Sequence, residues 1–173
     1  RLPHGIRKRA QKERNDWHPW GVNYLCKVQN STVQTVLLTV GATQEGYLKE
    51  GILLYAKRLQ RYTEFSHVVV SAADRLTSAL KSGDYVVLLD EHGVLLPSTG
   101  FAQQMQKWMN SGPKRLVFAV GDAYGFPEDF RARSSFQLAL GPMTLTHDMV
   151  RLLFVEQLYR AHTILRNEPY HHA

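Results

Sequence analysis

The segment RLVFAVGDAYGF, residues 115–126, joins an apolar run to a turn that contains two glycines. The run RLVFAV is typical of a strand buried on both faces, as the central strands of a parallel sheet are. A glycine-bearing turn at the end of such a strand is where α/β proteins usually bind a nucleotide-like ligand, because glycine lets the backbone come close. Asp122, a carboxylate between the two glycines, is unexpected there.

Further apolar runs with strand character lie on both sides of this segment and alternate with helical patterns. The runs are VQTVLLTVG (33–41), FSHVVVS (65–71), YVVLLDEHG (85–93) and FQLAL (136–140). The helical patterns occupy residues 45–62, 74–84, 97–112, 127–134 and 146–166. Strands that alternate with helices predict an α/β fold with a parallel sheet and flanking helices.

Ligands of such sheets bind at the carboxyl ends of the strands. Three segments are expected there: Leu89 to Gly93, Gly121 to Phe126 and Gly141 to His147. The sequence DEH at residues 90–92 reads either as an acid/base cluster or as an ordinary strand-ending turn. His147, which stands before the last helix, reads either as a general base or as a residue that bonds to a loop.

The composition is that of one globular domain. The chain has 173 residues, of which 44% are hydrophobic, enough for a core. A single cysteine, Cys26, excludes an internal disulfide and a cysteine-based zinc site, and it favours a reducing compartment. No stretch is long and apolar enough to span a membrane. The pair His171–His172 is a weak metal-binding pattern, so we expect no metal.

The charge is concentrated in an N-terminal arm, residues 1–31. This arm carries seven basic residues against two acidic ones, a net +5 out of the chain's total of +6. Arg7, Lys8 and Arg9 form its densest basic run. Such an arm suits a polyanion such as RNA, or it is simply a solvated tail. Its excess of arginine over acid is also typical of a mitochondrial transit peptide, and a bacterial cytoplasm is the alternative location.

The C-terminal segment LTHDMVRLLFVEQLYRAHTILRNEPYHH, residues 145–172, closely resembles the signature of the RlmH family. The family pattern is a threonine-hydrophobic pair, a histidine, an arginine, a Glu-x-x-Tyr-Arg helix and a closing Pro-Tyr-His. The segments VVLLDEHG and KRLVFAVGDAYGF are similar to the middle of the family. The resemblance covers residues 33–172 and predicts a domain at residues 32–173.

The members of the RlmH family are SPOUT methyltransferases that act on pseudouridine N3 in large-subunit ribosomal RNA. The resemblance implies a parallel sheet with a trefoil knot, a homodimer and S-adenosylmethionine as the methyl donor. Cofactor contacts carry over to the segments after three strands. They are Leu89, Gly121, Asp122, Gly141, Pro142, Met143, Thr144, Leu145 and Thr146.

The resemblance also implies the residues that meet RNA or the second subunit. His147 and Arg151 are the catalytic candidates, because uridine N3 must lose its proton before it accepts a methyl group. Arg151 is the stronger candidate for contacting the nucleotide. The RNA contacts that the resemblance implies are Arg151, Arg160, Tyr170 and His171, and the charge of the arm adds Arg7, Lys8 and Arg9.

Asp122 stands where the family usually has a second glycine, and this departure leaves two functions open. The side chain turns outward, attracts the cationic sulfonium, or blocks the pocket. Blocking is the expectation, since backbone-to-ligand contacts leave no room for a side chain. The chain is therefore expected to be either an active ribosomal RNA methyltransferase or a non-catalytic factor that binds ribosomal RNA in a ribosome or an assembly intermediate.

Overall fold

The computed structural model describes residues 33–171, and the arm at residues 1–31 lies outside them. Five parallel strands form one sheet in the order β2-β1-β4-β3-β5. The strands are β1 (Gln34–Val40), β2 (Phe65–Val70), β3 (Asp84–Leu95), β4 (Arg115–Val120) and β5 (Phe136–Ala139). The α/β fold and the five expected strands are thus confirmed.

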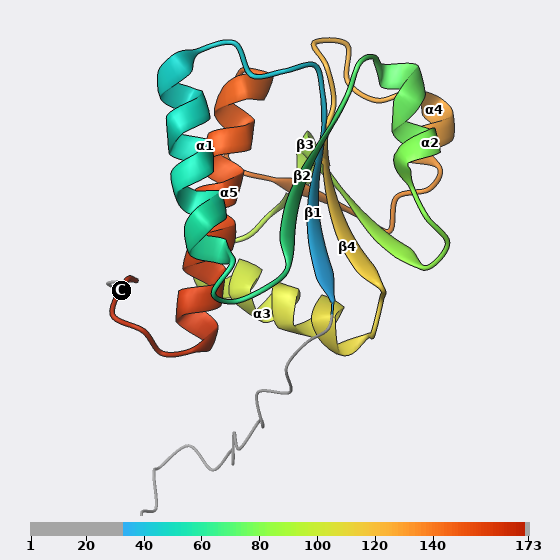
Figure 1. Ribbon diagram of the computed structural model, residues 1–173. Coiled ribbons are helices and arrows are strands. Elements are labelled where there is room, and N and C mark those ends of the chain that lie inside the picture. The colour runs from blue at the N-terminus through green and yellow to red at the C-terminus, as the bar shows by residue number, and fades with distance from the viewer. Residues whose placement is uncertain (1–32, 172–173) are drawn as a thin grey trace, which may run out of the picture.

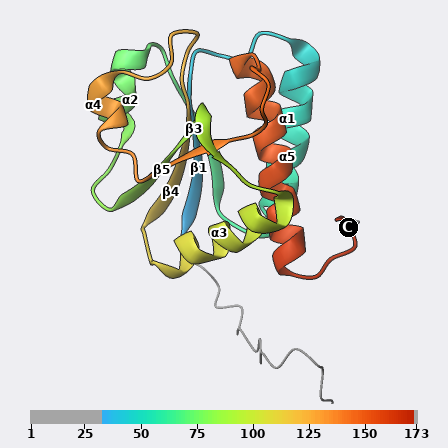
Figure 2. The ribbon, with the colours of Figure 1, turned by 180° about the vertical axis from the view of Figure 1, so that it is seen from behind.

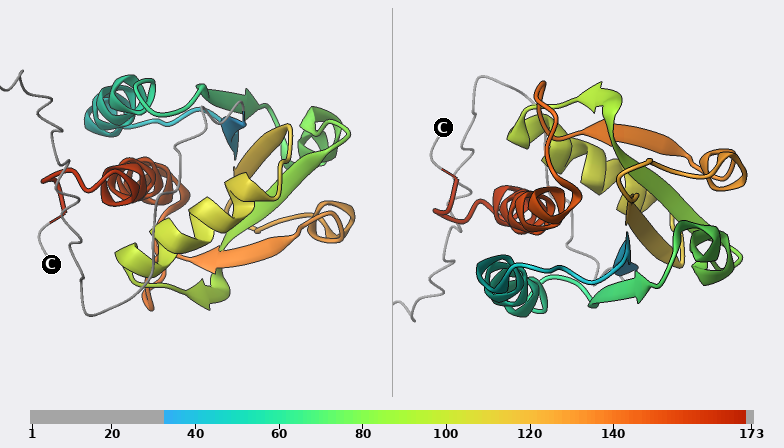
Figure 3. Two further views of the ribbon diagram at one scale, coloured as in Figure 1. Left: turned by 90° about the horizontal axis from the view of Figure 1, so that it is seen from below. Right: turned by 90° about the horizontal axis from the view of Figure 1, so that it is seen from above.

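Helices cover both faces of the sheet, giving three layers (Figures 1 and 3). One face carries α1 (Gly46–Leu59), α3 (Ser98–Asn110) and α5 (His147–Leu165). The other carries α2 (Leu76–Ala79) and α4 (Glu128–Arg131), with a 3₁₀ turn at Ala73–Arg75 before α2. The helix expected at residues 74–84 is therefore shorter than its pattern, because the chain turns at Lys81, whose N–H donates to Asp84.

The side-chain alternation of each strand explains the two cores. Leu37, Val87 and Phe118 face the α1, α3 and α5 layer, where Phe118 meets Phe154 of α5 at a ring distance of 4.5 Å. Their neighbours along the strands, such as Leu38 and Val117, face α2 and α4. Because every central strand is buried on both faces, the apolar runs lack the polar alternation of a half-exposed strand.

The last strand and helix bring the C-terminal signature to the site. Figure 2 shows β5 at the edge of the sheet and the segment that runs from it to the start of α5. Thr146 caps this helix, since its side chain accepts a hydrogen bond from the N–H of Met149. The first turn of α5 is therefore held at the carboxyl edge of the sheet.

A buried histidine on α5 makes stability depend on pH. His162 is 5% exposed and stacks on Tyr62 at a ring distance of 5.5 Å. Burial, and next the charge of Arg166, lowers the pKa of His162 to about 4. The unfolded chain takes up this proton near pH 6.5, so acid favours unfolding. Lowering the pH from 7 to 5 should cost about 2 kcal/mol of unfolding free energy through this residue.

Urea denaturation at pH 7 and at pH 5 checks this expectation. His162→Phe keeps a ring against Tyr62 but removes the titrating group, so it should lose less stability on acidification than the wild type. His67, whose pKa is also lowered by burial, stays in both proteins and cancels in the comparison. An equal loss in the two proteins would show that His162 does not govern the acid sensitivity.

Candidate functional site

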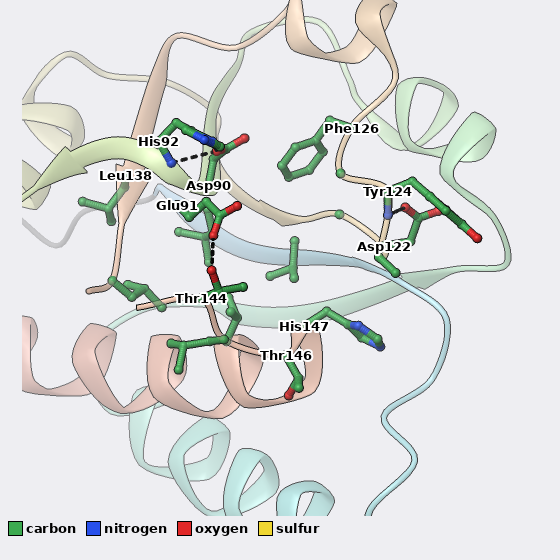
Figure 4. Close-up of a pocket in the computed structure, with 18 of the residues that line it drawn as sticks. Asp90, Glu91, His92, Asp122, Tyr124, Phe126, Leu138, Thr144, Thr146 and His147 are labelled. Atoms are coloured by element: carbon green, nitrogen blue, oxygen red, sulfur yellow. Dashed lines mark hydrogen bonds and ion pairs between the residues drawn. The ribbon is translucent and has the colours of Figure 1, made fainter. Parts of the chain in front are cut away.

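A cavity of about 670 Å³ opens at the carboxyl edge of the sheet, where β3, β4 and β5 end (Figure 4). Its walls come from three segments: residues 89–92 within β3, where the pairing with β5 shifts register, and the segments 120–126 and 140–147 that follow β4 and β5. These are the three segments that the sequence placed at this edge. The expected cofactor residues that line the cavity are Leu89, Gly121, Asp122, Gly141, Met143, Thr144, Leu145 and Thr146, while Pro142 does not line it.

The irregular middle of β3, at residues 90–92, contributes a network of charged side chains. The Asp90 carboxylate lies 3.1 Å from Nδ1 of His92 and 2.9 Å from the guanidinium of Arg131. Burial alone would raise the pKa of Asp90, but hydrogen bonds from His92 and the charge of Arg131 lower it overall. Glu91 accepts a hydrogen bond of 2.7 Å from Thr144, which ties this part of β3 to the loop before α5. Carboxylates therefore line one side of the cavity.

Asp122 does not extend freely into the cavity. Its Oδ1 accepts a hydrogen bond of 2.8 Å from the N–H of Tyr124, and its carbonyl oxygen accepts one of 3.1 Å from the N–H of Gly125. These contacts form an Asx turn, the usual use of an aspartate at the first position of a turn. The sequence led us to expect that the Asp122 side chain blocks the pocket. In the structure this side chain is instead bonded to the backbone of its own turn.

Arg131 is a cavity residue that the sequence did not indicate. It extends from α4 to the cavity wall, pairs with Asp90 and lies over the ring of Phe126, at 5.7 Å from the ring centre. Its ion-pair partner, Asp90, lies far away in the sequence, on β3. Local spacing carries no signal for such a contact, so only the fold could show it.

His147 lies on the cavity rim as the first residue of α5. Its side chain is 43% exposed, and its Nε2 lies 3.6 Å from a carboxylate oxygen of Asp148. The ring is thus open to a ligand on one side and near a carboxylate on the other. This placement suits a group that accepts a proton at the rim.

Arg151 lies elsewhere: its side chain is fully buried. The guanidinium donates to the carbonyl oxygen of Val40 at 2.6 Å and to the hydroxyl of Thr43 at 3.0 Å, and it pairs with Asp148 at 3.0 Å. Burial is at odds with the expected RNA contact. Arg151 instead fastens the first turns of α5 to the loop after β1.

The other expected RNA residues, Arg160, Tyr170 and His171, gather at the opposite end of α5, where the chain turns back (Figure 1). One oxygen of Glu156 accepts hydrogen bonds from the Tyr170 hydroxyl at 3.0 Å and from Arg160 at 2.7 Å. Glu156 and Arg160 thus form an ion pair across one turn of α5. Arg160 lies about 20 Å along the helix from His147, given a rise of about 1.5 Å per residue.

Some expectations fall outside the described residues, among them Arg7, Lys8 and Arg9 of the arm. Among residues 33–171, no helix is long and apolar enough to cross a membrane. Over the same residues, no three histidine, cysteine, aspartate or glutamate side chains come together as a metal site.

A parallel sheet with an open cavity at its carboxyl edge defines an α/β protein of the class whose ligand sites lie at that edge. Comparison with known proteins narrows this class. The family described as "Predicted SPOUT methyltransferase" matches residues 33–171. The chain belongs to the SPOUT methyltransferase family, and the resemblance found in its sequence is confirmed.

Three bacterial relatives carry the name "Ribosomal RNA large subunit methyltransferase H". The protein of Christiangramia forsetii is 40% identical over 152 residues, and that of Parabacteroides distasonis 41% identical over 152 residues. The protein of Geobacter metallireducens is 44% identical over 150 residues. Each match covers 79% of this chain and 97% of the relative, so the similarity spans nearly the whole of each bacterial protein.

Proposed function

We propose that this chain is an S-adenosylmethionine-dependent methyltransferase that modifies N3 of a pseudouridine in large-subunit ribosomal RNA. One observation carries the proposal. The three segments that the family resemblance assigns to the cofactor meet around a single cavity of about 670 Å³. That volume lies within the roughly 300–1,000 Å³ typical of ligand pockets.

The cavity residues fit such a cofactor. Leu89, Val120 and Leu138 supply apolar walls for a purine, and a Cβ on Gly141 would meet no atom within 4 Å, which leaves open space beside that backbone. The carboxylates of Asp90 and Glu91 favour a cation nearby. When bound, S-adenosylmethionine supplies an electrophilic methyl group on a positively charged sulfur.

The chain's own residues then position the acceptor and remove its proton. N3 of the base loses its proton as it forms the bond to carbon, and His147 receives that proton in this proposal, which its position on the cavity rim supports. Arg151 acts through Asp148, since it fixes the turn of α5 from which His147 extends. Holding the base in line supplies much of the remaining acceleration.

A homodimer and the trefoil knot are part of this proposal. Leu53 and Leu54 on α1 and Leu153 on α5 are exposed leucines, on two helices that pack side by side. A second copy that covers them would remove these leucines from water. Membership of the SPOUT methyltransferase family supports the knot.

The RNA partner extends the proposal to the arm. Arg7, Lys8 and Arg9 would contact phosphates without reading sequence. The mitochondrial location stays a prediction of the arm's composition, and fluorescence microscopy of the tagged full chain tests it. The bacterial relatives agree with the alternative.

Two measurements test the methyltransferase. Calorimetric titration with S-adenosylmethionine and S-adenosylhomocysteine should give micromolar dissociation constants, because the cavity fits both. Large ribosomal subunits incubated with the protein and radiolabelled cofactor should gain one methyl group, located by mass spectrometry of RNA fragments. RNA binding without cofactor binding would identify the non-catalytic factor instead.

A further inference from the structure

Tyr124 stands out because its side chain is 98% exposed at the rim of the cavity. Several other tyrosines described in the structure contact aromatic rings, as Tyr55 and Tyr62 contact Tyr159. Exposure by itself is common for single surface residues. What sets Tyr124 apart is the combination of an open ring with a backbone that is held in place.

The turn that carries Tyr124 is fixed at several points. Asp122 accepts the N–H of Tyr124 at 2.8 Å and the N–H of Gly125 at 3.1 Å. Gly121 packs against the Gly125 backbone so closely that an added Cβ would lie 2.4 Å from its carbonyl oxygen. Phe126, the next residue, is buried and stacks on Phe130 at a ring distance of 5.7 Å. The turn is therefore a rigid support.

A tyrosine on a rigid support is well suited to stacking. Only two side-chain torsions must be ordered when a flat ligand lands on the ring, so the entropy cost is small. Figure 4 shows the side chain of Tyr124 beyond Asp122, on the outer side of the turn. A ring there is accessible to a large flat group that approaches the cavity from outside.

We propose that Tyr124 is a stacking platform for an unpaired nucleobase of the RNA substrate, and that Asp122 is the positioning residue that holds it. The inference rests on the proposed function, because it takes RNA as the partner. Proteins recognise unpaired RNA bases chiefly by stacking them on aromatic side chains. The carboxylate between the two glycines then has a use: it orders the turn that presents the ring.

The test is RNA affinity, measured by fluorescence anisotropy with a fluorescein-labelled RNA hairpin that has unpaired uridines in its loop. Tyr124→Ala should weaken binding about 5- to 100-fold, the range found when a stacking aromatic is truncated. Tyr124→Phe keeps the ring face and should stay within about twofold of the wild type. Tyr47→Ala, which removes an exposed tyrosine from α1, is the matched control and should bind normally.

Asp122 is tested by a conservative pair of variants. Asp122→Asn keeps an oxygen that accepts the Tyr124 N–H, so it should bind RNA like the wild type. Asp122→Ala loses that acceptor and should weaken RNA binding about 3- to 10-fold. If Asn were as weak as Ala, the charge rather than the turn would matter, and the positioning role would be wrong.

The outcomes separate the inference from the function on which it rests. A wild type that methylates ribosomal RNA while Tyr124→Ala binds the hairpin normally overturns the platform and leaves the proposed function standing. A Tyr124→Ala variant that loses dimerisation with unchanged RNA affinity would assign the ring to a contact between copies. A wild type that binds neither ribosomal RNA nor the hairpin overturns both proposals.

Discussion

Arg151→Met should lower the free energy of unfolding by about 3–5 kcal/mol, the usual loss when one partner of a buried ion pair is removed. The guanidinium is fully buried and holds the Val40 carbonyl, the Thr43 hydroxyl and the Asp148 carboxylate. Methionine fills the space of the aliphatic stem but replaces none of these contacts. The Asp148 side chain, only 11% exposed, keeps its charge but loses the buried guanidinium that balanced it. Urea denaturation followed by circular dichroism measures the loss.

The double variant Arg151→Met, Asp148→Asn is the control for this explanation. An asparagine oxygen still accepts the N–H of Gln44, which lies 3.0 Å from Asp148 Oδ2. The unpaired charge is gone, so the double variant should recover about 1–3 kcal/mol relative to Arg151→Met. An Arg151→Met protein that is as stable as the wild type but binds ribosomal RNA weakly would restore the direct RNA contact expected from the sequence.

The fold was predictable from the sequence because its signals are local. RLVFAV and YVVLL are apolar without alternation, which is the consequence of burial between two helical layers. The end of the chain repeats apolar residues at helical spacing from Val150 onward, and α5 follows that spacing to Leu165. The helix expected at residues 74–84 was overestimated, because apolar spacing cannot show that Asp84 caps a turn at Lys81.

The location of the site, at the edge where three segments meet, was predictable from the sequence. The roles of individual side chains were predicted less well. Arg151 was read as a functional cation, although it shares a helix face with Phe154, Val155 and Leu158, and that spacing already indicated burial. Asp122 was compared with the glycine that the family usually has there, and so was expected to block the pocket. The order Asp-x-x-Gly from Asp122 to Gly125 is itself a turn signature. Contacts between distant segments, such as the Asp90–Arg131 and Glu91–Thr144 pairs, required the fold.

Gly121→Ala should weaken cofactor binding strongly. Calorimetry should give a dissociation constant for S-adenosylhomocysteine at least about tenfold larger than that of the wild type. A Cβ at Gly121 would lie 2.4 Å from the carbonyl oxygen of Gly125 and 2.8 Å from its carbonyl carbon. Both are backbone atoms, so the turn must open rather than a side chain rotate. Crowding of this kind typically costs about 1–3 kcal/mol of stability. The opening would also break the hydrogen bond from Gly125 to Asp122.

Gly141→Ala is the control that distinguishes two causes of weaker cofactor binding: a distorted turn after β4 and a smaller cavity. Gly141 also lines the cavity, but a Cβ there would meet no atom within 4 Å. Its alanine variant should therefore keep wild-type stability within about 0.5 kcal/mol. Weaker cofactor binding by this variant would show that the ligand occupies the space beside Gly141. Cofactor binding by Gly121→Ala at wild-type strength would instead mean that the turn after β4 does not contact the cofactor. The cofactor site would then be formed by the segments 89–92 and 140–147.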